Sequence, residues 1–278
     1  MKVSKKSYQR IVILGSNSFI AKYFIKYLKK NKINFLPINR KKIDFEKKNS
    51  SKYLSKVIRD NDTCVFVAAN APVRNEKMFL SNILMAKNIC NSIKTKNIKH
   101  FIYVSSDAVY ADSKKKIKET SKKEPDNLHG LMHLTREMMV KTIIDKKKLT
   151  IVRPTLIYGE GDPHNGYGPN QFLKLIRQKK NIKLFGKGEE LRDHIQVEDV
   201  ALMLYLIVKK NITGEFNLVT GKVISFLNIA KQLIKNYDSK IKIIFLKRTG
   251  PIPHNGYRAF CPSSLVSKIK NLKIKTLI

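Results

Sequence analysis

Two segments of the chain carry side chains that could move a proton. The first is YVSSDAVY at residues 103–110, in which Ser106 follows a short apolar run. The second is HGLMHLTR at residues 129–136, in which His129 and His133 stand four residues apart and share one face of a helix. A hydroxyl can hydrogen-bond a reacting oxygen, and an imidazole can act as a general base near neutral pH. The residue types therefore predict acid–base chemistry, provided that the fold brings the two segments together.

The apolar pattern of the chain predicts the scaffold that these residues need. Short apolar or β-branched runs predict strands at residues 10–15, 33–38, 63–69, 101–105 and 149–154. Helical spacing of apolar residues follows residue 19 and recurs over residues 78–93 and 129–144. Strands that alternate with helices in this way predict a doubly wound, Rossmann-like parallel sheet of the α/β class. Ligands bind such sheets at the carboxyl ends of the strands, where Gly15, Arg40, Ala69 and Ser105 fall.

The character of the chain changes after Pro154. Residues 158–170 (YGEGDPHNGYGPN) are rich in Gly, Pro and Asn, which is typical of a ligand lid or a hinge. Beyond them the pattern predicts helices at 171–178, 199–209 and 226–235, and strands at 182–185, 215–219 and 241–246. We therefore expect a large domain over residues 1–157 and a smaller C-terminal lobe over residues 158–278. Residues 192–220 are expected to pack back on the first domain.

The composition is strongly basic, with 56 Lys and Arg against 21 Asp and Glu and a formal net charge of +35. The excess is mostly lysine and is spread through every segment, whereas nucleic-acid binders concentrate Arg and aromatic residues on one surface. We therefore expect no nucleic-acid partner. The three cysteines have no metal-like spacing, which favours a reducing compartment. The apolar runs are too short for a signal peptide or a membrane span, so the sequence predicts a cytoplasmic protein.

The turn after the first predicted strand is similar to a dinucleotide-binding loop. Its sequence is GSNSFIA, and Gly15 permits the tight turn that such a loop makes. Backbone N–H groups at the start of the following helix would face a pyrophosphate. Ser18 and Ala21 stand where such loops often have glycine, and both are small enough for a close approach.

Several further motifs follow in order along the chain. They are AANAP at 68–72, YVSSDAVY at 103–110, RPTLIYG at 153–159, RDHIQVEDV at 192–200 and FNLVTG at 216–221. With the loop at Gly15, this series resembles the extended short-chain dehydrogenase/reductase family, in its nucleotide-sugar epimerase/dehydratase branch. The resemblance covers nearly the whole chain. It implies a dinucleotide-binding domain at residues 1–157 and a substrate-binding lobe at residues 158–278.

The resemblance implies an NADP or NAD cofactor. The basic side chain of Arg40 after the second strand suits a 2′-phosphate, so NADP is modestly favoured. Asp44 resembles the acid that contacts adenine. The cofactor residues expected on this basis are Gly15, Ser18, Phe19, Ile20, Arg40, Asp44, Ala69, Asn82 and Ser105.

The resemblance also implies the catalytic residues. Ser106 aligns with the serine or threonine that hydrogen-bonds the substrate oxygen. The 4,6-dehydratases have two acids after this position, whereas the present chain has Asp107 and Ala108. Dehydration is therefore disfavoured, and epimerase, reductase or dehydrogenase chemistry remains. The expected catalytic residues are Ser106, Asp107, His129 and His133.

His129 and His133 occupy the positions of the tyrosine and lysine that this family uses. Three interpretations remain open. His129 can act as the base, with His133 as its orienter or as a ribose contact. Alternatively, the protein has lost catalysis and only binds a nucleotide or nucleotide sugar. The i, i+4 spacing would also permit a metal site, but Gly130 replaces the glutamate of a zincin helix, and we expect no metal.

On the substrate side, Arg192 aligns with an arginine that contacts the sugar-nucleotide pyrophosphate. Asn170 and Arg258 are the other substrate-binding candidates. The resemblance implies an NAD(P)-dependent oxidoreductase or epimerase that acts on a nucleotide-activated sugar, in surface polysaccharide synthesis. It also implies a homodimer that forms through the helices at 78–93 and 129–144, with no membrane partner.

Overall fold

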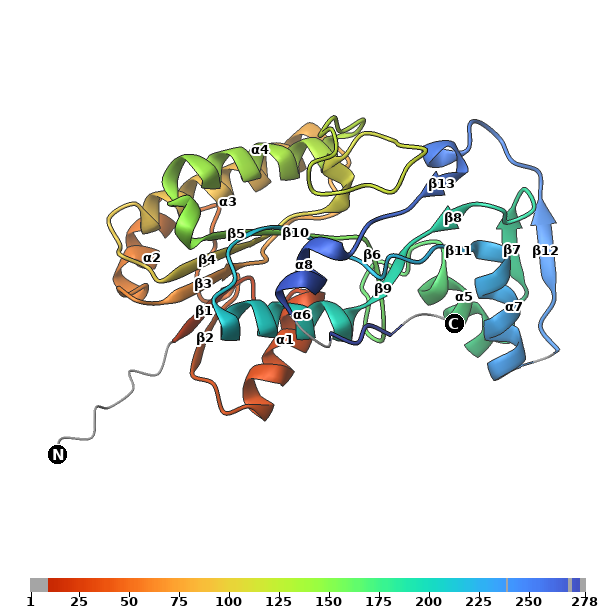
Figure 1. Cartoon of the computed structure of the whole chain (residues 1–278), viewed down its shortest axis with the longest axis horizontal. Helices are drawn as coiled ribbons and strands as arrows, with labels where there is room; N and C mark the ends of the chain where they lie inside the picture. Colours follow the sequence, from red (N-terminus) through yellow and green to blue (C-terminus); the bar gives the residue numbers. More distant parts are fainter. Residues whose placement is uncertain (1–9, 239, 270–271, 276–278) are drawn as a thin grey trace. The chain divides into compact units, whose positions relative to one another are not determined.

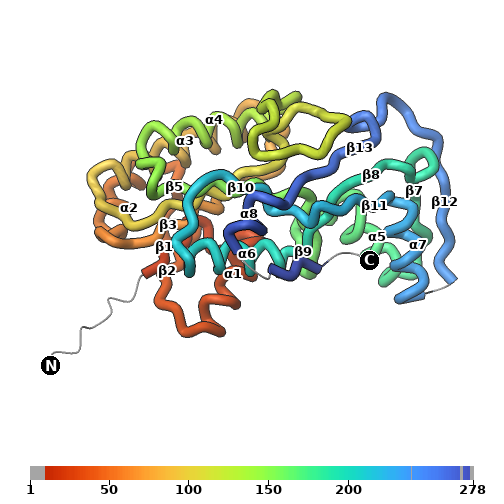
Figure 2. The backbone as a smooth tube through the Cα atoms, viewed as in Figure 1, coloured from red at the N-terminus to blue at the C-terminus, as the bar shows by residue number. Residues whose placement is uncertain are grey.

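The structure is a computed structural model that describes residues 10–238, 240–269 and 272–275. The chain forms two compact units, each built from several stretches of sequence. The first unit extends to Tyr110 and also takes in Lys122–Arg153 and Ala201–Phe216. The second unit consists of Ala111–Ser121, Pro154–Val200 and the chain from Asn217 onward. Figure 2 traces how the chain passes between these stretches.

The first unit is built on a six-stranded sheet. Its strands are β1 (Ile11–Leu14), β2 (Phe35–Ile38), β3 (Thr63–Phe66), β4 (His100–Val104), β5 (Leu149–Pro154) and β10 (Gly214–Leu218). They lie in the order β10-β5-β4-β3-β1-β2, and the pairs from β2 to β5 are parallel. Because β2 and β3 flank β1, the chain reverses direction across the sheet at β1. This reversal creates the switch point at which doubly wound sheets bind ligands.

Helices cover both faces of this sheet, which confirms the predicted doubly wound architecture. They are α1 (Phe19–Lys30), α2 (Ser50–Val57), α3 (Glu76–Ile93), α4 (Leu128–Ile143) and α6 (Val197–Lys210), with the short 3₁₀ helices η1 (Asp107–Val109) and η2 (Lys146–Lys148). Figure 1 shows α2, α3 and α4 on one face and α1 and α6 on the other. The sequence pattern did not predict α2, which buries only Ser50 and Leu54.

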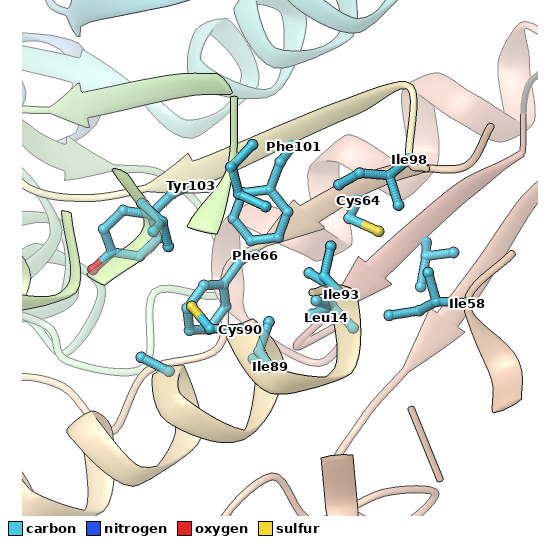
Figure 3. Packing of buried hydrophobic residues seen from close by; sticks show 14 of the residues in the cluster. Leu14, Ile58, Cys64, Phe66, Ile89, Cys90, Ile93, Ile98, Phe101 and Tyr103 are labelled. Atoms are coloured by element: carbon cyan, nitrogen blue, oxygen red, sulfur yellow. The ribbon is translucent and has the colours of Figure 1, made fainter. Parts of the chain in front are cut away.

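The core of the first unit lies between the sheet and the helices α2, α3 and α4. Strands β1, β3 and β4 are buried along their whole length, as expected for strands covered on both faces. Figure 3 shows Phe66 and Phe101 of the sheet packed with Ile89 and Ile93 of α3. Cys64 and Cys90 also lie in this cluster as free thiols. A covered sheet of this kind fixes the carboxyl ends of its strands, where the site residues lie.

The described part of the second unit contains three small sheets, three α-helices and a 3₁₀ helix. Its strands are β6 (Leu156–Tyr158), β7 (Ile182–Phe185), β8 (Leu191–Arg192), β9 (His194–Gln196), β11 (Ile224–Ser225), β12 (Ile243–Leu246) and β13 (Tyr257–Arg258). Its helices are α5 (Pro169–Arg177), α7 (Phe226–Tyr237), α8 (Ser263–Lys268) and the 3₁₀ helix η3 (Pro253–Gly256). The sheets pair as β11-β8-β13, β12-β7 and β6-β9, and Phe172, Phe226 and Ile229 anchor a separate core. Within the described ranges, no helix combines the length and apolar character of a membrane span.

A buried histidine makes the stability of the first unit sensitive to acid. His100 at the start of β4 has no exposed surface, and its Nε2 lies 2.7 Å from Thr150 Oγ1. Burial and the neighbouring Lys99 lower the pKa of His100 to about 4. The unfolded chain therefore takes up a proton from about pH 6.5 downward, whereas the folded chain resists it until about pH 4. The stabilisation that neutral His100 provides is fully present above about pH 6.5, and it is lost as the pH falls from about 6.5 to about 4.

We expect the free energy of unfolding to fall by about 3 kcal/mol between about pH 7 and pH 4 on account of His100. Urea denaturation at the two pH values measures this loss. The variant His100→Gln keeps a hydrogen-bonding group for Thr150 but cannot titrate, so its pH dependence should be smaller by that amount. An unchanged pH dependence in His100→Gln would show that His100 does not carry the effect.

Candidate active site

The turn between β1 and α1 has the geometry of a phosphate-binding loop. Gly15 has a φ of +104°, and a Cβ on it would lie 2.5 Å from the backbone nitrogen of Ala68. Glycine is therefore required both by the backbone conformation and by the close approach of the loop after β3. Ser18 caps α1 by accepting a hydrogen bond from the N–H of Ala21 at 3.3 Å. The first-turn residues Phe19 and Ile20 thus open a twelve-residue helix whose N-terminus favours an anion.

Arg40 and Asp44, the two residues expected at the adenosine end of a cofactor, lie together after β2. Arg40 Nε donates to Asp44 Oδ2 at 3.3 Å, and Arg40 Nη2 donates to Glu46 Oε1 at 2.9 Å. The Arg40 side chain is 68% exposed. Its guanidinium is therefore accessible but shared between two carboxylates.

Asn82 on α3 holds the loop that follows β3. Its buried side chain accepts a hydrogen bond from the N–H of Asn70 at 2.9 Å and donates to the carbonyls of Asn70 and Met78. The amide thus bonds to the protein backbone, and it fixes the loop that contains Ala69. Ala69 itself is exposed.

The two serines that follow β4 differ in burial and in their hydrogen-bond partners. Ser105 is buried, and its hydroxyl donates to Glu137 Oε1 of α4 at 2.7 Å. Ser106 is half-buried, and its Oγ caps η1 by accepting from the N–H of Ala108 at 3.2 Å. Ser106 Oγ also lies 3.4 Å from Asp107 Oδ1. The hydroxyl of Ser106 is therefore positioned by its own turn at the carboxyl edge of the sheet.

Helix α4 docks directly on this turn. Asn127 caps the helix by accepting from the N–H of Gly130 at 2.9 Å. A Cβ at Gly130 would lie 2.1 Å from the carbonyl oxygen of Ala108, so no other residue fits there without moving the helix. This contact packs the backbone of the first turn of α4, which contains His129, against the turn that Ser106 caps.

The two histidines are in contact, and they have different surroundings. Their ring centroids lie 4.8 Å apart in an edge-to-face arrangement, with His129 half-buried and His133 buried. His133 Nδ1 lies 2.8 Å from the hydroxyl of Tyr103 on β4. Burial, His129 and Arg136 lower the pKa of His133 well below its ordinary value. His133 is therefore neutral in the folded protein near neutral pH.

A buried ionic network supports the same edge of the sheet. Arg153 has no exposed surface and bonds Glu137 through two nitrogens, at 2.7 and 2.6 Å. It also donates to Glu215 Oε2 at 2.5 Å and to the hydroxyl of Tyr110 at 2.8 Å. Burial opposes the charge of Arg153, but the contacts with Glu137 raise its pKa. Through Ser105, this network holds the end of β4 in place.

The second unit gathers a group of arginines. In the parallel pairing of β13 with β8, Arg258 is the register partner of Arg192. Arg192 Nη2 donates to Glu190 Oε2 and to the carbonyl of Pro253, both at 2.6 Å. Arg248 pairs with the same Glu190, and Arg258 donates to Asp112 Oδ1 at 3.0 Å. Two of the substrate-binding candidates, Arg192 and Arg258, therefore lie side by side.

Asn170, the third substrate-binding candidate, belongs to a different hydrogen-bonded cluster. Its side chain accepts from the N–H of Gly159 at 3.0 Å and donates to Asp162 Oδ2 at 2.7 Å. These contacts close the Gly-rich loop on itself. For the metal interpretation, no group of three or more His, Cys, Asp or Glu residues that could hold an ion occurs among residues 10–238, 240–269 and 272–275.

The parallel six-stranded sheet and the glycine turn after β1 define a Rossmann-like α/β protein. Comparison with known families makes this specific. Residues 11–218 match the family described as NAD dependent epimerase/dehydratase family, and the chain belongs to that family.

Individual relatives are distant. The dTDP-D-glucose 4,6-dehydratase of Bos taurus is 25% identical over 258 residues, which cover 82% of this chain and 72% of the relative. The fold matches that of UDP-glucose 4-epimerase from Thermus thermophilus in complex with NAD, with a TM-score of 0.81, 16% identity and coverage of 94% and 93% of the two chains. It also matches a GDP-L-fucose synthetase from Naegleria fowleri bound to NADP, with a TM-score of 0.82, 17% identity and coverage of 96% and 90%.

Proposed function

We propose that this protein is an NAD(P)-dependent epimerase, reductase or dehydrogenase that acts on a nucleotide-activated sugar, with His129 as its general base. The observation that carries the proposal is the contact between Gly130 and the carbonyl of Ala108. This contact packs the first turn of α4 on the turn that Ser106 caps, which supports a site in which the imidazole of His129 and the hydroxyl of Ser106 act together at the carboxyl edge of the sheet, the edge of the Gly15 loop. Family membership supplies the cofactor class that such an edge would bind.

The residues present fit a dinucleotide. The close approach of Gly15 to Ala68 and the capped N-terminus of α1 form a backbone surface suited to a diphosphate. The nicotinamide of such a cofactor accepts or returns a hydride when it is bound. The chain supplies the proton chemistry: His129 takes the proton of a sugar hydroxyl, and Ser106 donates a hydrogen bond to the same oxygen. The absence of a second acid at Ala108 argues against elimination as the reaction.

The arginine group supports a diphosphate-bearing substrate. Among the described residues, the guanidinium groups of Arg192, Arg248 and Arg258 share the carboxylates of Glu190 and Asp112. His254 also contacts Asp112, and guanidinium groups outnumber carboxylates among these residues. Guanidinium groups suit phosphate oxygens because they donate in a planar fork. We assign this group to the diphosphate of the nucleotide sugar, and Asn170 to substrate binding from the Gly-rich loop of the same unit.

The cofactor preference follows from Arg40. We expect NADPH to bind more tightly than NADH, because the exposed guanidinium can exchange its carboxylate partners for a 2′-phosphate. Replacing Arg40 with alanine should weaken NADPH binding by about tenfold and leave NADH binding unchanged. Fluorescence titration of the two cofactors measures this, with the neighbouring Lys41→Ala as the matched control. Equal weakening of both cofactors in Arg40→Ala would contradict the assignment.

An apolar surface on α3 and α4 supports a homodimer. Leu80 and Leu84 on α3 are 55% and 40% exposed, and Leu131 and Met138 on α4 are 43% and 63% exposed. Residues spaced by four or seven positions share a helix face, and exposed apolar patches mark interaction surfaces. We assign this surface to a second copy of the chain. Light scattering of the purified protein should give twice the mass of one chain.

The test of the proposed function is a survey of substrates. The purified protein is incubated with NAD⁺, NADH, NADP⁺ or NADPH and a panel of UDP-, dTDP- and GDP-sugars, and the products are separated and weighed by mass spectrometry. Conversion of at least one nucleotide sugar is expected, with a role in polysaccharide synthesis as the cellular context. If the protein binds a dinucleotide tightly but converts no sugar, it is instead a nucleotide-binding protein that has lost catalysis.

A further inference from the structure

Behind the histidine pair lies a buried guanidinium that the sequence does not assign to any role. Arg136 follows His129 and His133 at helical spacing, so the three side chains form one stripe along α4. Arg136 has no exposed surface. A charge that is buried away from water must be stabilised by hydrogen bonds or by an opposite charge.

The contacts of Arg136 are with carbonyl oxygens. Its Nε and Nη2 donate to the carbonyl of Asn82 at 2.9 and 2.7 Å, and its Nη1 donates to the carbonyl of Ala68 at 2.8 Å. Its guanidinium carbon lies 4.8 Å from the centre of the Phe66 ring. Within the described residues no carboxylate pairs with it, because the neighbouring Glu137 is bonded to Arg153. The positive charge of Arg136 is therefore hydrogen-bonded but not neutralised.

Tyr103 connects this cation to the histidine pair. Its ring packs on Phe66, at 5.2 Å between centroids, and on His133, at 6.0 Å. Its hydroxyl lies 2.8 Å from His133 Nδ1, and Tyr103 and the Arg136 guanidinium both pack against Phe66, close enough for the cation to act on the phenol. Because the positive charge of Arg136 attracts the lone pairs of the phenol oxygen, the Tyr103 proton is directed away from Arg136 and toward His133 Nδ1.

This arrangement determines the form of His133. A Nδ1 that accepts the Tyr103 proton belongs to an imidazole whose own hydrogen is on Nε2. Burial, the imidazole of His129 and the uncompensated charge of Arg136 all oppose a second proton on the ring, in line with its lowered pKa. The other titratable groups that act on Tyr103 are Glu137 and the thiol of Cys90 on α3. Glu137 is already paired with Arg153, so it does not reverse the effect of Arg136.

We propose that Tyr103 and Arg136 are positioning residues that lock His133 as the neutral Nε2–H tautomer, so that His133 presents an N–H donor to a hydroxyl oxygen of the bound ligand and His129 is the only proton acceptor of the pair. This inference rests on the proposed function for the identity of that ligand. The tautomer itself is a property of the protein alone. It can therefore be tested without any substrate.

The experiment is a two-dimensional ¹H–¹⁵N spectrum of the imidazole rings in ¹⁵N-histidine-labelled protein. The chain has 6 histidines, and comparison with His133→Gln identifies the signals of His133. We expect a protonated Nε2 and an unprotonated Nδ1 that do not change between about pH 8 and about pH 5, whereas an ordinary imidazole titrates near 6.5. A Nδ1–H pattern, or titration of His133 within this range, would overturn the proposal.

Two variants test the two supports separately. Tyr103→Phe removes the hydroxyl but keeps the ring, so His133 should become a mixture of tautomers. Arg136→Gln keeps donors for the carbonyls but removes the charge that directs the Tyr103 proton. The Nε2–H signal of His133 should therefore lose intensity to the Nδ1–H form, while burial still keeps the ring neutral. The control is Tyr53→Phe at an exposed tyrosine of α2, which should leave the spectrum unchanged. If neither variant changes the imidazole signals of His133, Tyr103 and Arg136 do not act as positioning residues.

The outcomes separate this inference from the proposed function. A locked His133 in a protein that converts no nucleotide sugar would contradict the proposed function and leave the tautomer assignment standing. Turnover in a protein whose His133 titrates freely would contradict the inference alone. Circular dichroism and thermal unfolding of each variant confirm that the spectra report on folded protein.

Discussion

Replacing His129 with glutamine is expected to lower kcat by about 10²- to 10⁴-fold, the contribution of a general base. Glutamine keeps the size and polarity of the side chain but cannot accept the proton of a sugar hydroxyl at neutral pH. The dinucleotide should bind as before, because the Gly15 loop and α1 do not depend on this side chain. A steady-state assay on the substrate found in the survey, together with a cofactor titration, measures both quantities.

The matched control for this variant is His100→Gln. It makes the same substitution in the same unit, but at the first residue of β4, whereas Ser106 lies two residues beyond the last residue of that strand. Its kcat should equal that of the wild type at neutral pH. If His129→Gln retained wild-type kcat, another group would have to be the base.

Replacing Arg153 with methionine is expected to destabilise the protein by about 3–5 kcal/mol, the cost of leaving one partner of a buried ion pair without the other. Glu137 is fully buried, and Arg153 supplies two of its hydrogen bonds. Glu215 should contribute less to the loss of stability, because its carboxylate keeps an ion pair with Lys141 at 2.6 Å. Urea denaturation monitored by circular dichroism gives the change in the free energy of unfolding.

A double variant distinguishes the lost charge pair from a general packing defect. In Glu137→Gln/Arg153→Met the buried carboxylate is gone, yet the amide oxygen can still accept the hydrogen bond of Ser105. The double variant should therefore recover much of the stability that Arg153→Met loses. If it were as unstable as the sum of the two single variants, the ion pair would not be the source of the effect.

Most of the fold could be predicted from the sequence because its signals are local. The apolar strand at Leu149–Pro154 and the helix that ends near Ile93 agree with the structure to within a residue or two. Helix α2 was missed because Ser50–Val57 buries few residues and so carries little periodic signal.

The site was less predictable, because its partners come from distant parts of the sequence. The motifs indicated Ser106 and His129, but Tyr103 and Arg136 read as ordinary members of a strand and a helix. One signal was available for Arg136, whose spacing from the two histidines places it on their face of α4. For Asn82, no signal in the sequence could have predicted the observed contacts. Its contacts with Asn70 depend on the path of the loop after β3, which no local pattern encodes.

The most direct test of the central claim is a single-turnover measurement of hydride transfer. The enzyme is mixed in excess with the nucleotide sugar and the oxidised dinucleotide, and the absorbance of reduced nicotinamide is followed with time. The account predicts that reduced nicotinamide forms in the wild type and fails to form on the same time scale in His129→Gln. If the dinucleotide stayed oxidised with every nucleotide sugar, and if no reduced dinucleotide were consumed in the reverse direction, the protein would not be the oxidoreductase proposed.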